Sequence, residues 1–232
     1  MGNIAIYATK GFEYLLILGF LAVFTTFYLY FTSTRFEPVR AGIRRGFNSM
    51  VEWFQIPDDV HFHQGHTWMQ RDRDDPRAVR VGLDDFAQKM VGNINLVSTA
   101  KVGEQIKQGE QAWNLWIGNK SVSMLAPVSG EIVEVNKACQ TNGAILNDDP
   151  FGAGWIYKII PENITKESKN LLSGSLAKKW METVVDKLRV QMSPEMDVVY
   201  QDGGVPMPGM ARNIDKDNWE SLVADFFLTR NQ

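Results

Sequence analysis

Residues 126–136 read Ala-Pro-Val-Ser-Gly-Glu-Ile-Val-Glu-Val-Asn, and residues 147–155 read Asn-Asp-Asp-Pro-Phe-Gly-Ala-Gly-Trp. Each stretch joins a cluster of turn-forming residues to a short apolar run, which is typical of a β-strand that follows a turn. The two stretches predict strands over residues 130–135 and 154–160, in a compact domain that is rich in β-structure.

Short apolar runs that are separated by glycine and by Asn or Asp continue on both sides of these stretches. Residues 102–109 form a turn-rich link of similar character to residues 126–132, which hints at two halves of a small quasi-symmetric sandwich. Residues 83–91 and 176–188 instead show the apolar spacing of helices. Because further strands are predicted over residues 78–81, 94–97, 112–117 and 121–125, the expected fold class is mainly β with flanking helices (α+β).

Three further motifs stand at fixed distances from the two quoted stretches. Residues 66–68 read His-Thr-Trp, residues 81–88 read Val-Gly-Leu-Asp-Asp-Phe-Ala-Gln, and residues 92–94 read Gly-Asn-Ile. In these motifs and their spacing, the chain resembles the H protein of the glycine cleavage system from about residue 62 to residue 161. The resemblance implies a lipoyl/H-protein-like barrel-sandwich hybrid.

The family carries a lipoyl group on a lysine at the tip of a β-hairpin, and this position can be found by counting. In the family pattern the lysine lies ten positions after the glycine that matches Gly109 and seven before the alanine that matches Ala126. Both counts reach Asn119. The amide nitrogen of asparagine is already acylated and is not nucleophilic, so Asn119 cannot form the amide with lipoate. No cofactor is therefore expected at the family position.

Lys120 offers an alternative acceptor beside that position. Lipoate on Lys120 would require the hairpin turn to shift by one residue relative to the family pattern. Such a slip reverses the face that each following side chain occupies, unless a bulge absorbs it. A solvated turn lysine is the alternative interpretation of Lys120.

Apolar side chains on the same hairpin and in the last predicted helix suggest contacts with a partner protein. Trp is a favoured anchor of interfaces, and Trp116 stands where the family has a glutamate. Alternatively, the hairpin members that share one face belong to the core, and the last helix, which Asp215 could cap, packs on its own domain. The predicted partner-binding residues are Trp113, Trp116, Ile117, Trp219, Phe226 and Phe227.

Residues 12–31 are nearly unbroken in apolar character, which predicts a transmembrane helix that contacts the bilayer through residues 12–33. Four arginines between residues 35 and 45 follow this segment, so the C-terminal part is expected to face the cytoplasm. Residues 39–54 show helical spacing and form either an amphipathic surface helix or a continuation of the anchor.

Composition and motifs exclude several classes of function. A net charge of -3 and the absence of a long basic run argue against nucleic acid as a partner. The single cysteine, Cys139, excludes an internal disulfide. His61, His63 and His66 are interpreted as polar strand and loop residues and not as a metal site. No catalytic residues and no enzyme activity are predicted, because no paired acid and base or nucleophile motif is found.

Together these observations predict a non-catalytic accessory or scaffold subunit of a bacterial membrane complex, of the respiratory or electron-transfer kind. It would bind other subunits of an integral membrane complex at the inner membrane as a single-pass protein. The alternatives are a membrane-tethered lipoyl carrier modified at Lys120, serving a glycine-cleavage-like or other dehydrogenase system, and a module that binds lipoyl-processing enzymes. The expected parts are an anchor (1–33), a linker (34–60), the H-protein-like domain (61–162), a helical extension (163–192) and a C-terminal tail (193–232).

Overall fold

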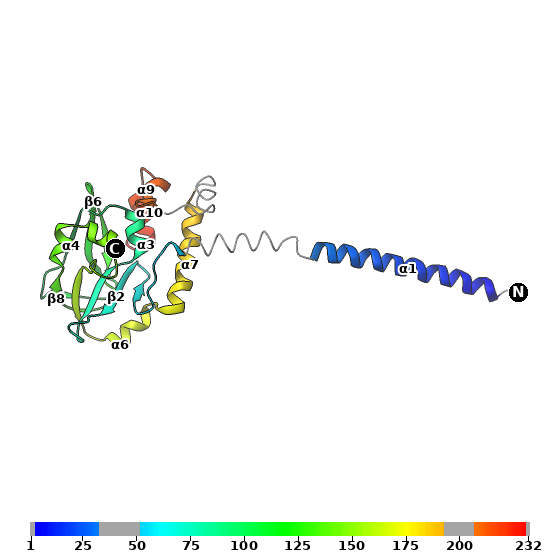
Figure 1. The fold of residues 1–232 in the computed structure, drawn as a ribbon, viewed down its shortest axis with the longest axis horizontal. Helices are drawn as coiled ribbons and strands as arrows, with labels where there is room; N and C mark the ends of the chain where they lie inside the picture. Colours follow the sequence, from blue (N-terminus) through cyan, green and yellow to red (C-terminus); the bar gives the residue numbers. More distant parts are fainter. Residues whose placement is uncertain (1–2, 33–51, 193–206, 231–232) are drawn as a thin grey trace. The chain divides into compact units, whose positions relative to one another are not determined.

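The computed structural model describes residues 3–32, 52–192 and 207–230 (Figure 1). The chain divides into two compact units, Met1–Gly46 and Phe47–Gln232. Most of the expected linker (34–60) and residues 193–206 of the expected C-terminal tail lie outside the described residues.

The first unit contains one long helix, α1 (Asn3–Thr32). Large apolar side chains between Tyr14 and Tyr28 are exposed on it. In the described part of the chain, no helix combines the length and the apolar character that crossing a membrane requires. The transmembrane helix expected over residues 12–33 thus finds no support here.

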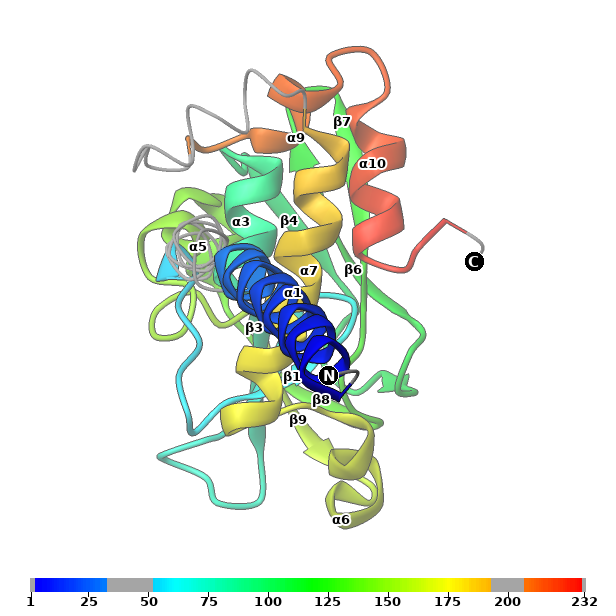
Figure 2. The same ribbon diagram turned by 90° about the vertical axis from the view of Figure 1, so that its right-hand side faces the viewer.

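The strands of the described residues form two antiparallel sheets in the second unit (Figure 2). One sheet has six strands in the order β1-β2-β3-β9-β8-β5, and the other has three in the order β4-β6-β7. The strands are β1 (His61–His63), β2 (Thr67–Arg71), β3 (Val79–Leu83), β4 (Leu96–Thr99), β5 (Gln105–Ile106), β6 (Gln111–Ile117), β7 (Lys120–Leu125), β8 (Gly130–Val135) and β9 (Tyr157–Pro161).

All six predicted strands are present, with shifted ends in five of them. Strands β1, β2 and β5 were not predicted; β1 and β5 have only three and two residues, too few to show a periodic pattern. Strand β2 begins in the His-Thr-Trp motif, whose Trp68 is fully buried and donates its indole N–H to the carbonyl of Leu83 at 2.8 Å. Gly82 lies directly against this ring: a Cβ there would come within 2.5 Å of Trp68, so a side chain at that position would displace it.

The helices flank the sheets. Asp84 caps α3, since its carboxylate accepts the backbone N–H of Ala87 at 2.8 Å. The predicted helix over residues 176–188 is confirmed as part of α7. The helices of the second unit that have described bounds are α3 (Asp85–Val91), α4 (Lys137–Thr141), α5 (Ala144–Asp148), α6 (Ile164–Glu167), the 3-10 helix η1 (Ser168–Asn170), α7 (Gly174–Gln191), α9 (Met210–Ile214) and α10 (Trp219–Phe226).

The main core lies between the two sheets and extends to the helices. Trp113 of β6 and Tyr157 of β9 meet edge to face across it, with ring centroids 5.4 Å apart. Buried side chains of α3, α7, α9 and α10 belong to the same cluster. The C-terminal segment is therefore an integral part of the domain, which decides in favour of the alternative in which the last helix packs on its own domain.

Candidate functional site

The hairpin of β6 and β7 closes with a two-residue loop, Gly118-Asn119. Ile117 pairs with Lys120 across the strands, so no residue is left over at the turn. Gly118 has a φ of 65°, the left-handed region that two-residue hairpin loops use and that glycine tolerates best. Its backbone N–H donates to the side-chain oxygen of Asn95 at 2.6 Å, which ties the loop to the segment before β4.

Both residues of this loop are exposed, and Asn119 carries its only side chain beyond a hydrogen atom. The register shifts only near the base of the hairpin, between Gln111 and Trp113, and is regular from there to the turn. The residue at the counted lipoyl position therefore stands at the tip of the hairpin, and its amide offers no site for acylation. The one-residue slip that would bring a lysine into the loop is absent.

Lys120 begins β7 and is the single amine of the hairpin. Residues directly opposite each other in an antiparallel pair share a face, so Lys120 leaves the sheet on the same face as the buried Ile117. Its ammonium group forms an ion pair with the carboxylate of Glu220 on α10. The two side chains are 39% and 38% exposed, so solvent still reaches the pair.

The residues predicted to bind a partner separate into two groups. Trp116 is 38% exposed and lies opposite Leu96, which is 45% exposed, on the outer face of the small sheet. The other five lie in the core, because alternate residues of β6 face inward and the stripe of α10 is covered by its own domain. This burial corrects the expectation that Trp113, Ile117, Trp219, Phe226 and Phe227 offer a surface to another protein.

Helices α3 and α7, which come earlier in the chain, hold α10 in place. The ring of Phe226 packs against Phe86 of α3, with centroids 5.4 Å apart, and the ammonium of Lys187 on α7 lies 4.4 Å from the centroid of Phe226. Asn218 occupies the N-cap position of α10 that was expected for Asp215. Asp215 instead accepts the backbone N–H of Asn218 at 2.9 Å, in the turn that leads into the helix.

The three histidines do not converge. His66 is buried and its Nδ1 lies 2.8 Å from the carboxylate of Asp84. The Nδ1 of His63 accepts the backbone N–H of Gly65, and His61 lines a surface cavity next to Arg71. Within the described residues no group of three or more His, Cys, Asp or Glu side chains is arranged to hold a metal ion.

Sequence reasoning missed Glu220 altogether. Glu220 and Lys120 are 100 residues apart, and no local pattern links a carboxylate in a late helix to a hairpin lysine. It also missed the cavity beside His61, since its walls come from strands β1, β2 and β3 and from the α6–η1 segment.

Residues 60–184 match the profile of a family described as Glycine cleavage H-protein. The chain is 37% identical over 115 residues to the glycine cleavage system H protein of Acinetobacter baumannii, covering 50% of this chain and 90% of that protein. It is 41% identical over 105 residues to the glycine cleavage system H protein of Mycobacterium avium, covering 45% and 77%. A crystal structure of a glycine cleavage system H protein from Mycobacterium marinum matches with 33% identity and a TM-score of 0.43, covering 46% of this chain and 87% of that one.

Proposed function

Because the chain belongs to the glycine cleavage H-protein family across residues 60–184, we propose that its domain is a non-catalytic carrier that attaches lipoate at Lys120. One observation supports this choice of residue: Lys120 is the single lysine between residues 111 and 125, directly follows the hairpin loop and is partly exposed. Lipoate on Lys120 would supply the disulfide that accepts an aminomethyl unit in the family.

Attachment at Lys120 requires its amine to leave Glu220. An amine that is acylated must present a free electron pair, which an ammonium group bound to a carboxylate does not have. Ion pairs between side chains as exposed as these contribute only about 0–1 kcal/mol, so the release costs little. The flexible four-carbon stem of lysine then extends the amine past the end of the hairpin.

The test is the intact mass of the full-length protein isolated from its native cells, with fragment mapping of the peptide that contains Asn119 and Lys120. A lipoyl increment on Lys120 is expected, and it should vanish in Lys120→Arg but persist in Lys137→Arg, which changes an exposed lysine outside the hairpin. Glu220→Gln is expected to raise the modified fraction. An unmodified peptide from cells that lipoylate their other carriers would reject the carrier function.

A second candidate is an unmodified binding subunit, favoured by Asn119 at the hairpin tip and by the exposed Trp116 beside Leu96. In this case the partner is a subunit of a membrane-bound respiratory or electron-transfer complex. Copurification of such subunits with the full-length protein should be lost in Trp116→Ala and retained in Leu176→Ala, which truncates an exposed leucine of α7. Lys120→Arg should then have no effect on the assembly.

We further propose that the N-terminal helix attaches the protein to a membrane, as expected from the sequence for both the carrier and the binding subunit. The exposed apolar side chains of α1 between Tyr14 and Tyr28 support it, because such a surface is unfavourable in water. Fractionation of cells, followed by extraction with carbonate and then with detergent, tests the attachment. Recovery of the full-length protein in the soluble fraction would reject the inner-membrane location with the domain facing the cytoplasm.

A further inference from the structure

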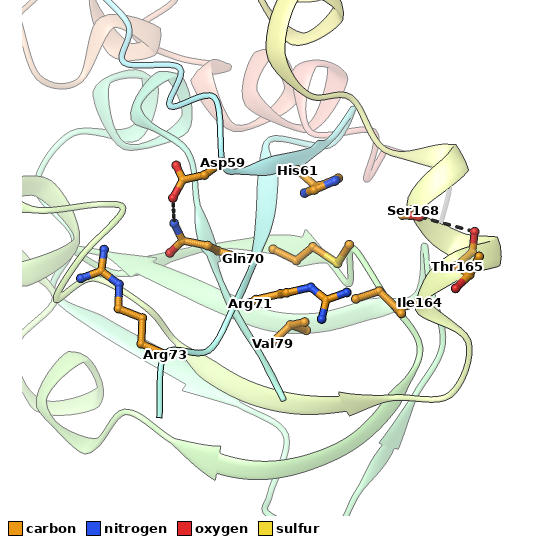
Figure 3. A pocket seen from close by; sticks show the side chains of 10 residues that line it. Asp59, His61, Gln70, Arg71, Arg73, Val79, Ile164, Thr165 and Ser168 are labelled. Atoms are coloured by element: carbon orange, nitrogen blue, oxygen red, sulfur yellow. Dashed lines mark hydrogen bonds between the residues drawn. The ribbon is translucent and has the colours of Figure 1, made fainter. Parts of the chain in front are cut away.

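A cavity of about 470 Å³ lies on the surface of the large sheet (Figure 3). Its walls come from β1, β2 and β3 and from the α6–η1 segment. In both ribbon views α6 lies at the end of the domain opposite the hairpin of β6 and β7 (Figures 1 and 2). The volume is within the range of small-molecule sites, about 300–1,000 Å³. The cavity is thus a separate candidate site, whose use does not depend on Lys120.

The floor of the cavity is apolar. Met69 and Val79 are buried and lie on neighbouring strands, and Ile164 of α6 adds a half-buried side chain from the other wall. Together they offer a surface against which a short hydrocarbon chain can be removed from water. A fully polar ligand such as a free sugar would leave this surface uncovered.

A cationic group lies next to these apolar side chains, and no acidic partner for it is found in the part of the chain that the structure describes. Arg71 ends β2, and among the described residues its guanidinium makes no ion pair or hydrogen bond. By contrast, Arg77, in the loop that follows, pairs with Asp75 at 2.9 Å. A guanidinium presents a planar fork of N–H donors that matches a carboxylate. Arg71 is therefore free to receive an anion.

His61 lies beside Arg71 in the cavity. Burial lowers the pKa of His61, and the positive charge of Arg71 lowers it further, so its ring is neutral at pH 7 and provides a hydrogen-bonding nitrogen without adding charge. On the other side of the cavity, Asp59 accepts the side-chain N–H of Gln70 at 2.6 Å, and Arg73 also lies on that side (Figure 3). The wall carries two arginines and one aspartate, so its net charge is positive by one unit and suits a monoanion.

We propose that this cavity binds a small monocarboxylate with a short hydrocarbon chain. The carboxylate binds the guanidinium of Arg71 and the ring of His61, and the chain lies against Met69, Val79 and Ile164. A doubly charged phosphate matches the site less well, because one guanidinium faces a neutral imidazole and Asp59 repels added negative charge.

The test is a titration of the full-length protein with octanoate, followed by calorimetry or ligand-observed NMR. Arg71→Gln should weaken octanoate binding at least tenfold. The matched control is Arg77→Gln, which removes the same charge from an exposed arginine outside the cavity and should leave the affinity unchanged. Equal affinities of the two variants would overturn the proposal.

Two comparisons separate the carboxylate from the chain. Octanol should bind at least tenfold more weakly than octanoate to the unchanged protein, and Ile164→Ala should weaken octanoate more than acetate. Octanol binding as tightly as octanoate, or inorganic phosphate binding more tightly, would overturn the proposal. Lys120→Arg should leave octanoate binding unchanged, so failure of the carrier function and failure of the cavity are distinguishable.

Discussion

Truncation of Phe226 to alanine tests whether α10 is part of the folded domain. The side chain is 3% exposed, and it packs between Phe86 and the ammonium of Lys187. Removing a buried phenylalanine ring costs about 3–5 kcal/mol, which includes the cavity that remains. We expect about 3–4 kcal/mol, because α10 lies at the edge of the domain and can partly relax into the space. For a domain of this size the loss lowers the melting temperature by roughly 6–16 °C.

The measurement is unfolding of the full-length protein in urea and on heating, followed by tryptophan fluorescence. Val190→Ala is the control: Val190 is 82% exposed on α7, and its truncation should change the free energy of unfolding by less than about 0.5 kcal/mol. If Phe226→Ala is no more destabilising than this control, α10 does not pack on the domain. The expectation that the apolar face of α10 binds a partner protein would then be restored.

Three further changes test other parts of the fold. Gly92→Ala places a Cβ 2.7 Å from the backbone nitrogen of Gly209, at a φ of 80°. The change should lower the free energy of unfolding in urea by at least about 1–2 kcal/mol and speed proteolysis after residue 192. Unchanged proteolysis would contradict the contact. Asp84→Ala removes the cap of α3 and leaves His66 buried without its partner. The free energy of unfolding should fall by about 3–5 kcal/mol. A loss below about 1 kcal/mol would refute the buried pair. Burial alone would raise the pKa of Asp72, but two backbone N–H groups and a lysine ammonium outweigh it and hold the pKa below 3.8. The carboxylate thus stabilises the fold above about pH 4, and this contribution is lost as the pH falls through the lowered pKa. A pH series of urea midpoints should fall less steeply below pH 4 in Asp72→Asn than in the unchanged protein, and parallel curves would exclude this role.

Local periodicity was sufficient to predict most of the β-structure. Strands β6, β7 and β8 combine apolar residues with turn signals at their ends, and these signals act between neighbours in sequence. Strands β1 and β5 could not be predicted, because segments of three and two residues are held by pairing with β2 and β8 and not by their own pattern.

The hairpin position followed from the sequence, but the surroundings of its lysine did not. Counting from Gly109 and Ala126 placed Asn119 at the family position, and the register of β6 and β7 places the same residue in the loop. The carboxylate that binds Lys120 comes from α10, and only the folded chain brings Glu220 to the hairpin.

The spacing of Trp219, Val223 and Phe226 was enough to predict that the last helix has an apolar stripe. The same spacing could not predict what covers this stripe. The hydrophobic effect favours the removal of apolar surface from water but is non-directional, so it does not specify the covering element. In the folded chain α3 and α7 cover the stripe, and α10 is thereby held so that Glu220 lies beside Lys120.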